Sequence, residues 1–325
     1  MCTQDSLLDS LSPEQLYERP APPLPENIYL GTSTWTFPDW KGVVYKKPYA
    51  SEADFRRNCL REYATIPWFR TVCIDSTFYT PPTSQKLLEL ATLVPNDFLW
   101  ISKVWKHITT PHFPKHRRYG SLAGRENPNF LNPTLFKEQI LASYTDPKVF
   151  EKTGPLILQF PPFSRHTLQY DTFIEKLESF LYEIPKNFRY AVEIRNEELL
   201  NQNYFSILNK HGATHCFNQW NSMPSLHQQM RAAASSGGLR ASFYVARLLT
   251  PRGLSYQEAA KKFEPYTALK QVDEKMRRDA ITFLQRAVKT GKSTFITANN
   301  KAEGNSALTM ASLGALLTSR LRNRS

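Results

Sequence analysis

Acidic and basic side chains stand at the ends of several short β-rich runs in this chain, where they could act together. Residues alternate between the two faces of a sheet, so Cys73 and Asp75 share one face of the run TVCIDST. In RYAVEIR, the same alternation places Glu193 and Arg195 on one face. A buried acid and base cannot stand unpaired without a large desolvation cost. The pattern therefore predicts either a buried ion pair that ties the fold together or a catalytic or ligand-clamping site.

Further polar residues end the other β-rich runs. Guanidinium groups can hold a phosphate or carboxylate through paired donors, and the carboxylate of Glu193 or Asp75 can act as a general base. A lysine or an arginine can stabilise negative charge that develops during a reaction. If one cavity collects all these groups, it is suited to anion binding and acid–base chemistry. The other members of the set are Lys103, Gln159, Asn218, Arg247 and Asn299.

The elements that must position these residues are eight β-rich runs that alternate with helix-like segments. Such alternation predicts βαβ units and a parallel sheet. Eight units in 325 residues indicate a single closed (β/α)8 TIM-type barrel, with a doubly wound open sheet as the alternative. Sites in such barrels lie at the C-terminal ends of the strands and in the loops that follow. The predicted strands are IYLGTS, TVCIDST, FLWISKVW, PLILQFP, RYAVEIR, THCFNQW, SFYVARLL and STFITAN, and the predicted helices are 51–66, 83–93, 135–144, 168–183, 202–211, 225–234, 256–290 and 306–321.

The chain divides into a short arm and one large domain. Residues 1–27 contain the proline-rich stretch PAPPLP and lack a periodic pattern, which predicts a disordered or extended arm. The barrel domain is then expected over residues 28–321. In the segment 256–290, basic residues that include Arg277 and Arg278 are partly balanced by acids, which is typical of a solvated helix face.

Aromatic residues are concentrated in the loop that follows the first predicted strand, GTSTWTFPDW. Trp35 and Trp40 would lie at the rim of the barrel, either as a binding platform for a ligand or as a plug for the top of the barrel. Tyr79 and Trp220 follow later strands and join the same set of candidate ligand contacts.

The stretch from Ile101 to Arg125, which contains the loop after the third predicted strand, is strongly basic and carries half of the net charge of +12. Its cations alternate with Phe113 and Tyr119, a combination that suits contact with the backbone and bases of a nucleic acid. The alternative is a mobile loop whose charges serve solubility. The candidate nucleic-acid contacts are Lys106, Lys115, Arg117, Arg118 and Arg125.

Several functional classes find no support in the sequence. No apolar run approaches the roughly 20 residues that span a bilayer, and the N-terminus has neither the basic nor the apolar region of a signal peptide. The four cysteines lack CxxC spacing, so we expect a cytoplasmic protein with free thiols. No histidine set, GxGxxG or Walker A motif is present, so no metal and no cofactor are expected.

Ordered motifs along the chain resemble those of the domain-of-unknown-function 72 (YecE-like) family. The motifs are GTSTWTFPDWKG, DSTFY, SKVWKHIT, GPLILQFPP, AVEIR and ANNKAEGNSA, and they extend over residues 28–317. The resemblance implies a TIM-type barrel but supplies no reaction. Residues that match the family pattern are Glu193, Arg195, Lys103, Gln159, Asn299 and Asn300, whereas Cys73, Asp75, Thr110 and Leu248 depart from it.

The leading hypothesis is a barrel whose mouth binds a phosphate-bearing ligand, with nucleic acid as the expected class. The same site is also a candidate for metal-independent hydrolase or lyase chemistry, with Glu193, Arg195, Asp75 and Lys103 as the catalytic residues. The sequence does not establish that the protein is an enzyme. One alternative is an enzyme that acts on a sugar or sugar phosphate, with aromatic side chains stacked on the sugar and a carboxylate pair as acid and base. The other is a non-catalytic binding module. The sequence gives no oligomeric state.

Overall fold

The computed structural model describes residues 7–20, 22–115 and 117–323, and among them eight parallel strands close into a barrel. Each strand pairs with its neighbour in chain order, and β8 pairs with β1, so the predicted (β/α)8 architecture is confirmed. Gly31 in β1 is needed at one seam, because a Cβ there would lie 1.8 Å from the Thr71 carbonyl oxygen of β2. The strands are β1 Ile28–Thr32, β2 Thr71–Ile74, β3 Trp100–Lys103, β4 Thr153–Gln159, β5 Tyr190–Glu193, β6 Thr214–Gln219, β7 Phe243–Leu248 and β8 Ser293–Ala298.

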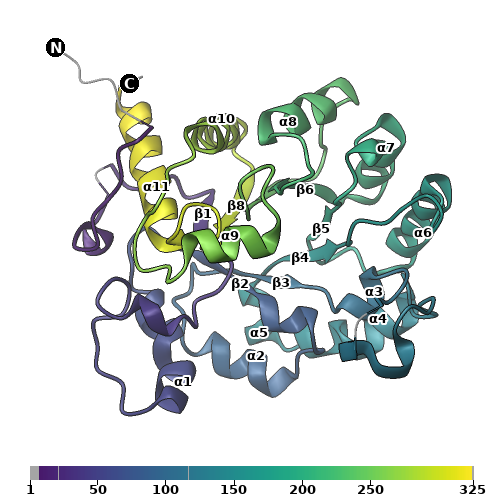
Figure 1. Ribbon diagram of the computed structural model, residues 1–325, viewed down its shortest axis with the longest axis horizontal. Coiled ribbons are helices and arrows are strands. Elements are labelled where there is room, and N and C mark those ends of the chain that lie inside the picture. The colour runs from purple at the N-terminus through teal and green to yellow at the C-terminus, as the bar shows by residue number, and fades with distance from the viewer. Residues whose placement is uncertain (1–6, 21, 116, 324–325) are drawn as a thin grey trace.

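Helices surround the strands as an outer ring (Figure 1). Their ends carry the expected capping residues: the Ser51 side chain accepts from Asp54 N at the start of α1, and Gly212 adopts φ 70° after α7. The helices are α1 Glu52–Tyr63, α2 Ser84–Ala91, α3 Lys106–Thr109, α4 Pro133–Gln139, α5 Pro147–Lys152, α6 Tyr170–Glu183, α7 Gln202–His211, α8 Leu226–Ser235, α9 Tyr256–Phe263, α10 Glu274–Thr290 and α11 Ser306–Arg322.

The longest predicted helix is interrupted in the structure. The single helix expected over 256–290 is two helices, α9 and α10, separated by a loop that begins at Glu264. Pro265 explains the break, because proline has no N–H to continue the hydrogen-bond ladder and its ring clashes with the preceding turn.

Two hydrophobic layers hold the barrel. The inner layer fills the barrel below the mouth and consists of Cys73, Ile101, Ile157, Ala191, Cys216, Ala241, Phe243, Val245 and Phe295. Residues of opposite parity, such as Val72 and Val192, belong to the larger layer between the strands and the helices. The side-chain directions expected in β2 and β5 therefore match the layers found.

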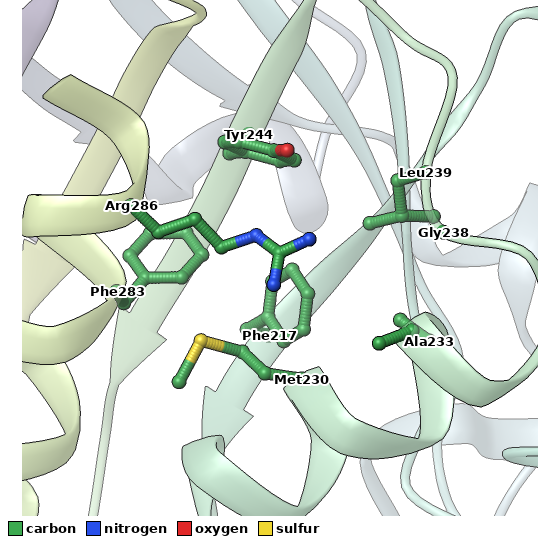
Figure 2. A pocket seen from close by; sticks show the side chains of 9 residues that line it. Phe217, Met230, Ala233, Gly238, Leu239, Tyr244, Phe283 and Arg286 are labelled. Atoms are coloured by element: carbon green, nitrogen blue, oxygen red, sulfur yellow. The ribbon is translucent and has the colours of Figure 1, made fainter. Parts of the chain in front are cut away.

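Helices α8 and α10 leave a small gap outside β6 and β7, which Figure 2 shows from close by. Phe217 and Tyr244 form its inner wall, and the Arg286 side chain extends between them. The cavity measures about 20 Å³, roughly the space of one water molecule. We therefore interpret it as a packing gap rather than a ligand site.

The described part of the N-terminal arm lies along the barrel domain beside α11, as Figure 1 shows. It has one short 3-10 helix, Gln15–Tyr17, and Leu16 within it is fully buried. Ser312 of α11 accepts a hydrogen bond from Leu11 N. The described part of the arm is therefore packed against the barrel domain.

Arg277 of α10 corrects the expectation of a solvated helix face. Its side chain is fully buried and pairs with Glu303, at 2.8 Å from Nη2 to Oε2. Its guanidinium also donates to the carbonyl oxygens of Leu7 and Asp9 in the arm. Other basic residues of the helix are exposed, as expected: Arg278, Arg286 and Lys289. The arm covers a position that the helical pattern alone assigns to solvent.

Candidate binding site at the barrel mouth

Glu193, at the C-terminal end of β5, is the centre of a buried ion cluster at the barrel mouth. Arg195 Nη2 donates to its Oε1, and Arg247 Nη1 donates to its Oε2 at 2.7 Å. All three side chains are at most 5% exposed. Glu193, Arg195 and Arg247 therefore come together, as strand parity predicted. Each carboxylate oxygen of Glu193 accepts a hydrogen bond from a different guanidinium.

Asp75 and Lys103 extend this cluster towards the surface. The Lys103 ammonium lies 3.5 Å from Asp75 Oδ1, and Arg247 Nη2 lies at the same distance from that oxygen. Asp75 is 33% exposed, whereas the two cations are almost completely buried. Gln159 accepts from Arg247 Nη1 at 3.2 Å. The acid that follows β2 and the base that ends β3 thus join the charged residues at β5 and β7 in one group.

Three buried polar atoms of this region have no hydrogen-bond partner among the described residues. They are Arg195 Nη1, Arg247 Nε and Asn218 Oδ1. Asn218 uses its amide nitrogen instead, which donates to the main-chain oxygens of Ile194 and Cys216. Buried polar atoms are seldom left without partners, so two unpartnered guanidinium nitrogens in one cluster point to an acceptor from a bound molecule.

The charges of the cluster do not cancel. Three cations, Lys103, Arg195 and Arg247, face two carboxylates, Asp75 and Glu193, which leaves a net charge of +1. Since burial disfavours an uncompensated charge, an anion at the mouth would stabilise this arrangement. The electrostatics therefore favour a negatively charged ligand.

The state of Glu193 limits the chemistry that it can perform. Burial acts to raise its pKa, but Arg195 and Arg247 outweigh burial and lower the pKa to about 2. A carboxylate that holds its proton so weakly is a poor general base near neutral pH. Burial also raises the pKa of the Cys73 and Cys216 thiols, so both remain neutral and unreactive. We conclude that Glu193 orients the two arginines.

This pKa predicts an acid-dependent loss of stability. Because the pKa of Glu193 is lowered from 4.5, its ionised form contributes stability above the unfolded-state value. That contribution, about 3 kcal/mol, should disappear as the pH falls from 4.5 to about 2. Urea unfolding across this pH range should show that the free energy of unfolding falls more steeply for the wild type than for Glu193→Gln. Parallel curves for the two proteins would contradict the assignment.

A pocket of about 580 Å³ opens beside the cluster, between the loops after β1 and β2 and helix α2. Asp75 belongs to both the cluster and the pocket. The basic side chains of Arg56 and Lys86 also line the pocket. Its other lining residues are Thr34, Trp35, Thr36, Ile74, Ser76, Thr77, Tyr79, Thr80, Pro81, Pro82, Thr83, Leu87 and Leu90.

The four candidate aromatic residues occupy different environments. Trp35 and Tyr79 line the pocket, and Tyr79 is 58% exposed. Trp40 is fully buried and packs near Phe37 and Tyr45, so it has no surface to offer a ligand. Trp220 lies under Arg195, whose guanidinium carbon is 3.9 Å from the ring centroid. The loop after β1 therefore both supports the top of the barrel and contributes to the pocket.

The two asparagines after β8 have local structural contacts. Asn299 Oδ1 accepts from Lys301 N, and Asn300 Oδ1 accepts from both the N–H and the hydroxyl of Ser306. These bonds shape the turn that leads into α11. The contacts observed for both side chains are with the protein itself.

The basic loop is folded rather than open. Phe113 N donates to the Arg125 carbonyl, and the Asn127 side chain donates to the carbonyls of His107 and Thr110. Lys106 lies 4.7 Å from the centroid of Tyr119 and 5.7 Å from that of Tyr79, which connects the loop to the pocket. Lys115, Arg117 and Arg125 are exposed, and the side chain of Arg118 lies outside the described part of the structure.

Comparison with known proteins places this barrel in a family. The family model "Protein of unknown function DUF72" matches residues 29–324. The chain belongs to the DUF72 family. A solved DUF72 protein from Thermotoga maritima MSB8 is 21% identical, with a TM-score of 0.58, and the match covers 91% of this chain and 99% of that one. A DUF72 protein from Enterococcus faecalis V583 is 14% identical, with a TM-score of 0.59 and coverage of 89% and 95%. Among curated protein sequences, none matches significantly.

The positions where this DUF72 protein departs from the expected family pattern fall in two environments. Asp75 lies at the mouth, and Cys73 lies in the inner hydrophobic layer directly below it, from where its thiol donates to Asp75 Oδ1 at 3.3 Å. Thr110 and Leu248 are buried, and Leu248 packs in the layer between strands and helices. Of these positions, Asp75 therefore belongs to the ion cluster and the pocket, whereas Leu248 belongs to the packing behind them.

The histidine of β6 has a structural role in this DUF72 protein. His215 is fully buried, and its two ring nitrogens bond with Tyr204 Oη at 2.9 Å and Gln229 Oε1 at 3.0 Å. Burial lowers its pKa to about 4, so it is neutral near pH 7. Within the described ranges, no group of three or more His, Cys, Asp or Glu side chains could hold a metal ion. None of the helices there could cross a membrane.

Trp105 is a pocket neighbour that the sequence analysis missed. Its Nε1 donates to the Tyr79 carbonyl oxygen at 3.2 Å, and its ring stacks on His107 at 4.2 Å. The available signal was its place two residues after Lys103, at the end of the third β-rich run. Strand parity continued from Lys103 to the last residue of that run would have added Trp105 to the candidates.

Proposed function

We propose that the mouth of this DUF72 barrel binds a phosphate-bearing ligand, and that the ligand is a nucleic acid. The observation that carries this proposal is the ion cluster of net charge +1, in which Arg195 Nη1 and Arg247 Nε have no partner among the described residues. A phosphate oxygen is a suitable acceptor for such donors, because guanidinium and phosphate form short, charge-assisted hydrogen bonds.

The basic loop supports a polymeric ligand over a small one. Lys115, Arg117 and Arg125 are exposed on the loop after β3, and Lys106 connects this loop to Tyr79 at the pocket. A nucleic acid that follows the loop could place one phosphate near the cluster and others against these cations. Contacts of this kind account for most of the affinity in sequence-independent binding.

An enzyme that acts on a sugar receives less support from the geometry. Trp40 is fully buried, and one face of Trp220 is covered by Arg195, so two of the four expected stacking surfaces are occupied by the protein. Glu193, with its pKa of about 2, is also a poor partner for an acid–base pair. The proposed role is therefore binding, with no bond-breaking step assigned to Glu193.

The test is fluorescence anisotropy with labelled oligonucleotides over a salt series. The double variant Arg117→Glu/Arg125→Glu should bind at least about tenfold more weakly at low salt, because two phosphate contacts become repulsive. Its plot of log affinity against log salt concentration should be shallower by about 2.

The matched control is Arg240→Glu/Lys289→Glu, which makes the same change in net charge. Arg240 and Lys289 are exposed and lie just before β7 and β8, at the end of the barrel opposite the mouth. This variant should lose less than about threefold in affinity if the contact is local. Equal losses in the two variants would show that only the overall charge matters, and no binding by the wild type would refute the proposal.

A further inference from the structure

We propose that the ligand is single-stranded and that one of its bases enters the pocket beside Asp75 and stacks on Tyr79. This inference rests on the proposed function and specifies the form of the nucleic acid. In a duplex, the bases are stacked and present only their edges, so a ring can enter such a pocket only from a single strand or an unpaired position.

The pocket has the size and lining for one base. Its volume of about 580 Å³ lies within the range of roughly 300–1,000 Å³ that is typical of small-molecule sites. Tyr79 supplies an exposed ring, and Pro81 and Pro82 add apolar wall. Such surfaces accept any base, because every base has a face that can stack.

Polar groups are also present for a base and its phosphate. Trp35 lines the pocket and is 9% exposed, and its indole Nε1 is buried without a hydrogen-bond partner among the described residues. This N–H is a donor for an exocyclic carbonyl or ring nitrogen of a base. Lys106, at 5.7 Å from the centroid of Tyr79, stands where it can pair with a phosphate next to the stacked base.

The aromatic residues of the loop after β3 continue from the pocket towards its basic tip. Trp105 donates a hydrogen bond to the main chain of Tyr79, and its ring stacks on that of His107. The ring centroids of His107 and Phe113 are 5.0 Å apart, and those of Phe113 and Tyr119 are 5.6 Å apart. Cations and aromatic rings thus follow one path. Phe113 is buried and joins these rings by packing, so the partly exposed rings of Trp105, His107 and Tyr119 are the ones that a single strand can contact by stacking.

The experiment compares a labelled 12-nucleotide oligo-dT, its duplex and a backbone strand without bases, each titrated with wild type and Tyr79→Ala. Tyr79→Ala should weaken oligo-dT binding at least about fivefold and leave the affinity for the base-free strand unchanged. Tyr79→Phe, which keeps the ring, should bind like the wild type. The hydrogen bond from Trp105 is kept in this variant, because it goes to the Tyr79 main-chain oxygen.

The control is Tyr182→Ala, which removes a tyrosine that is 74% exposed on α6, outside the pocket. It should leave oligo-dT affinity unchanged. Equal wild-type affinity for oligo-dT and the duplex, or no effect of Tyr79→Ala on oligo-dT, would overturn this inference and leave the proposed function standing. Absence of salt-dependent binding to every probe would refute both.

Discussion

Replacing Arg247 with methionine is expected to lower the free energy of unfolding by about 3–5 kcal/mol. Arg247 is 2% exposed and joins two acids, with Nη1 at 2.7 Å from Glu193 and Nη2 at 3.5 Å from Asp75. Methionine fills part of the same volume but leaves Glu193, which is fully buried, with only Arg195 as a cationic hydrogen-bond partner. The cost is large because a charge without full compensation remains in the interior. Urea unfolding at pH 7, followed by circular dichroism, measures it.

Two further variants separate this effect from simple loss of an arginine. Arg231→Met, at an exposed position of α8, should change stability by less than about 0.5 kcal/mol. The double variant Glu193→Gln/Arg247→Met should be less destabilised than the sum of its single variants, because the charge left behind is removed as well. A loss below about 1 kcal/mol in Arg247→Met would mean that the cluster does not depend on this pair.

The sequence predicted the cluster because the rules that place its members are local. Alternation along β5 fixes the side of Glu193 from its neighbours Val192 and Ile194, without knowledge of any contact. Closure of the barrel then brings the ends of β2, β3, β5 and β7 to one mouth. The identity and approximate position of the ionic site follow from these two steps.

The sequence did not predict which of the candidate groups would make contacts within the protein instead of being available to a ligand. Trp40 was a candidate for ligand contact, but the short 3-10 helix Pro38–Trp40 places it against Tyr45 in the core. The proton affinity of Glu193 was also open, since it depends on two arginines from different strands at specific distances. Such outcomes depend on loop conformation and rotamers, which residue spacing does not encode.

Arg277 shows the same limit for contacts between distant parts of the chain. A helical pattern of mixed charges predicts solvent on its polar face, provided that nothing covers it. Here residues 7–10 cover it, although they precede Arg277 by roughly 270 positions. No local signal in α10 or in the arm indicates this docking.

The Arg277 side chain should therefore be as important for stability as Arg247. All its N–H groups have acceptors: Nε and Nη2 donate to Glu303, Nη1 donates to the carbonyls of Leu7 and Asp9, and Nη2 also donates to Ser10 Oγ. Arg277→Met is expected to lower the free energy of unfolding by about 3–5 kcal/mol, since Glu303 is also fully buried and would keep its charge. It should also release the arm, so limited digestion with the glutamate-specific protease Glu-C should cut after Glu14 and Glu18 faster than in the wild type.

The neighbouring residue provides the control, because Arg278 lies on the same helix with 63% of its side chain exposed. Arg278→Met should change stability by less than about 0.5 kcal/mol and leave digestion of the arm at the wild-type rate. Arg277→Lys should fall between the two, since lysine keeps the charge but lacks the planar set of donors that reaches the arm and Glu303 together. If Arg277→Met destabilised the protein while the arm kept its resistance to Glu-C, the pair with Glu303 would stabilise α10 alone, and the arm would be held by Leu16 and Ser312 instead.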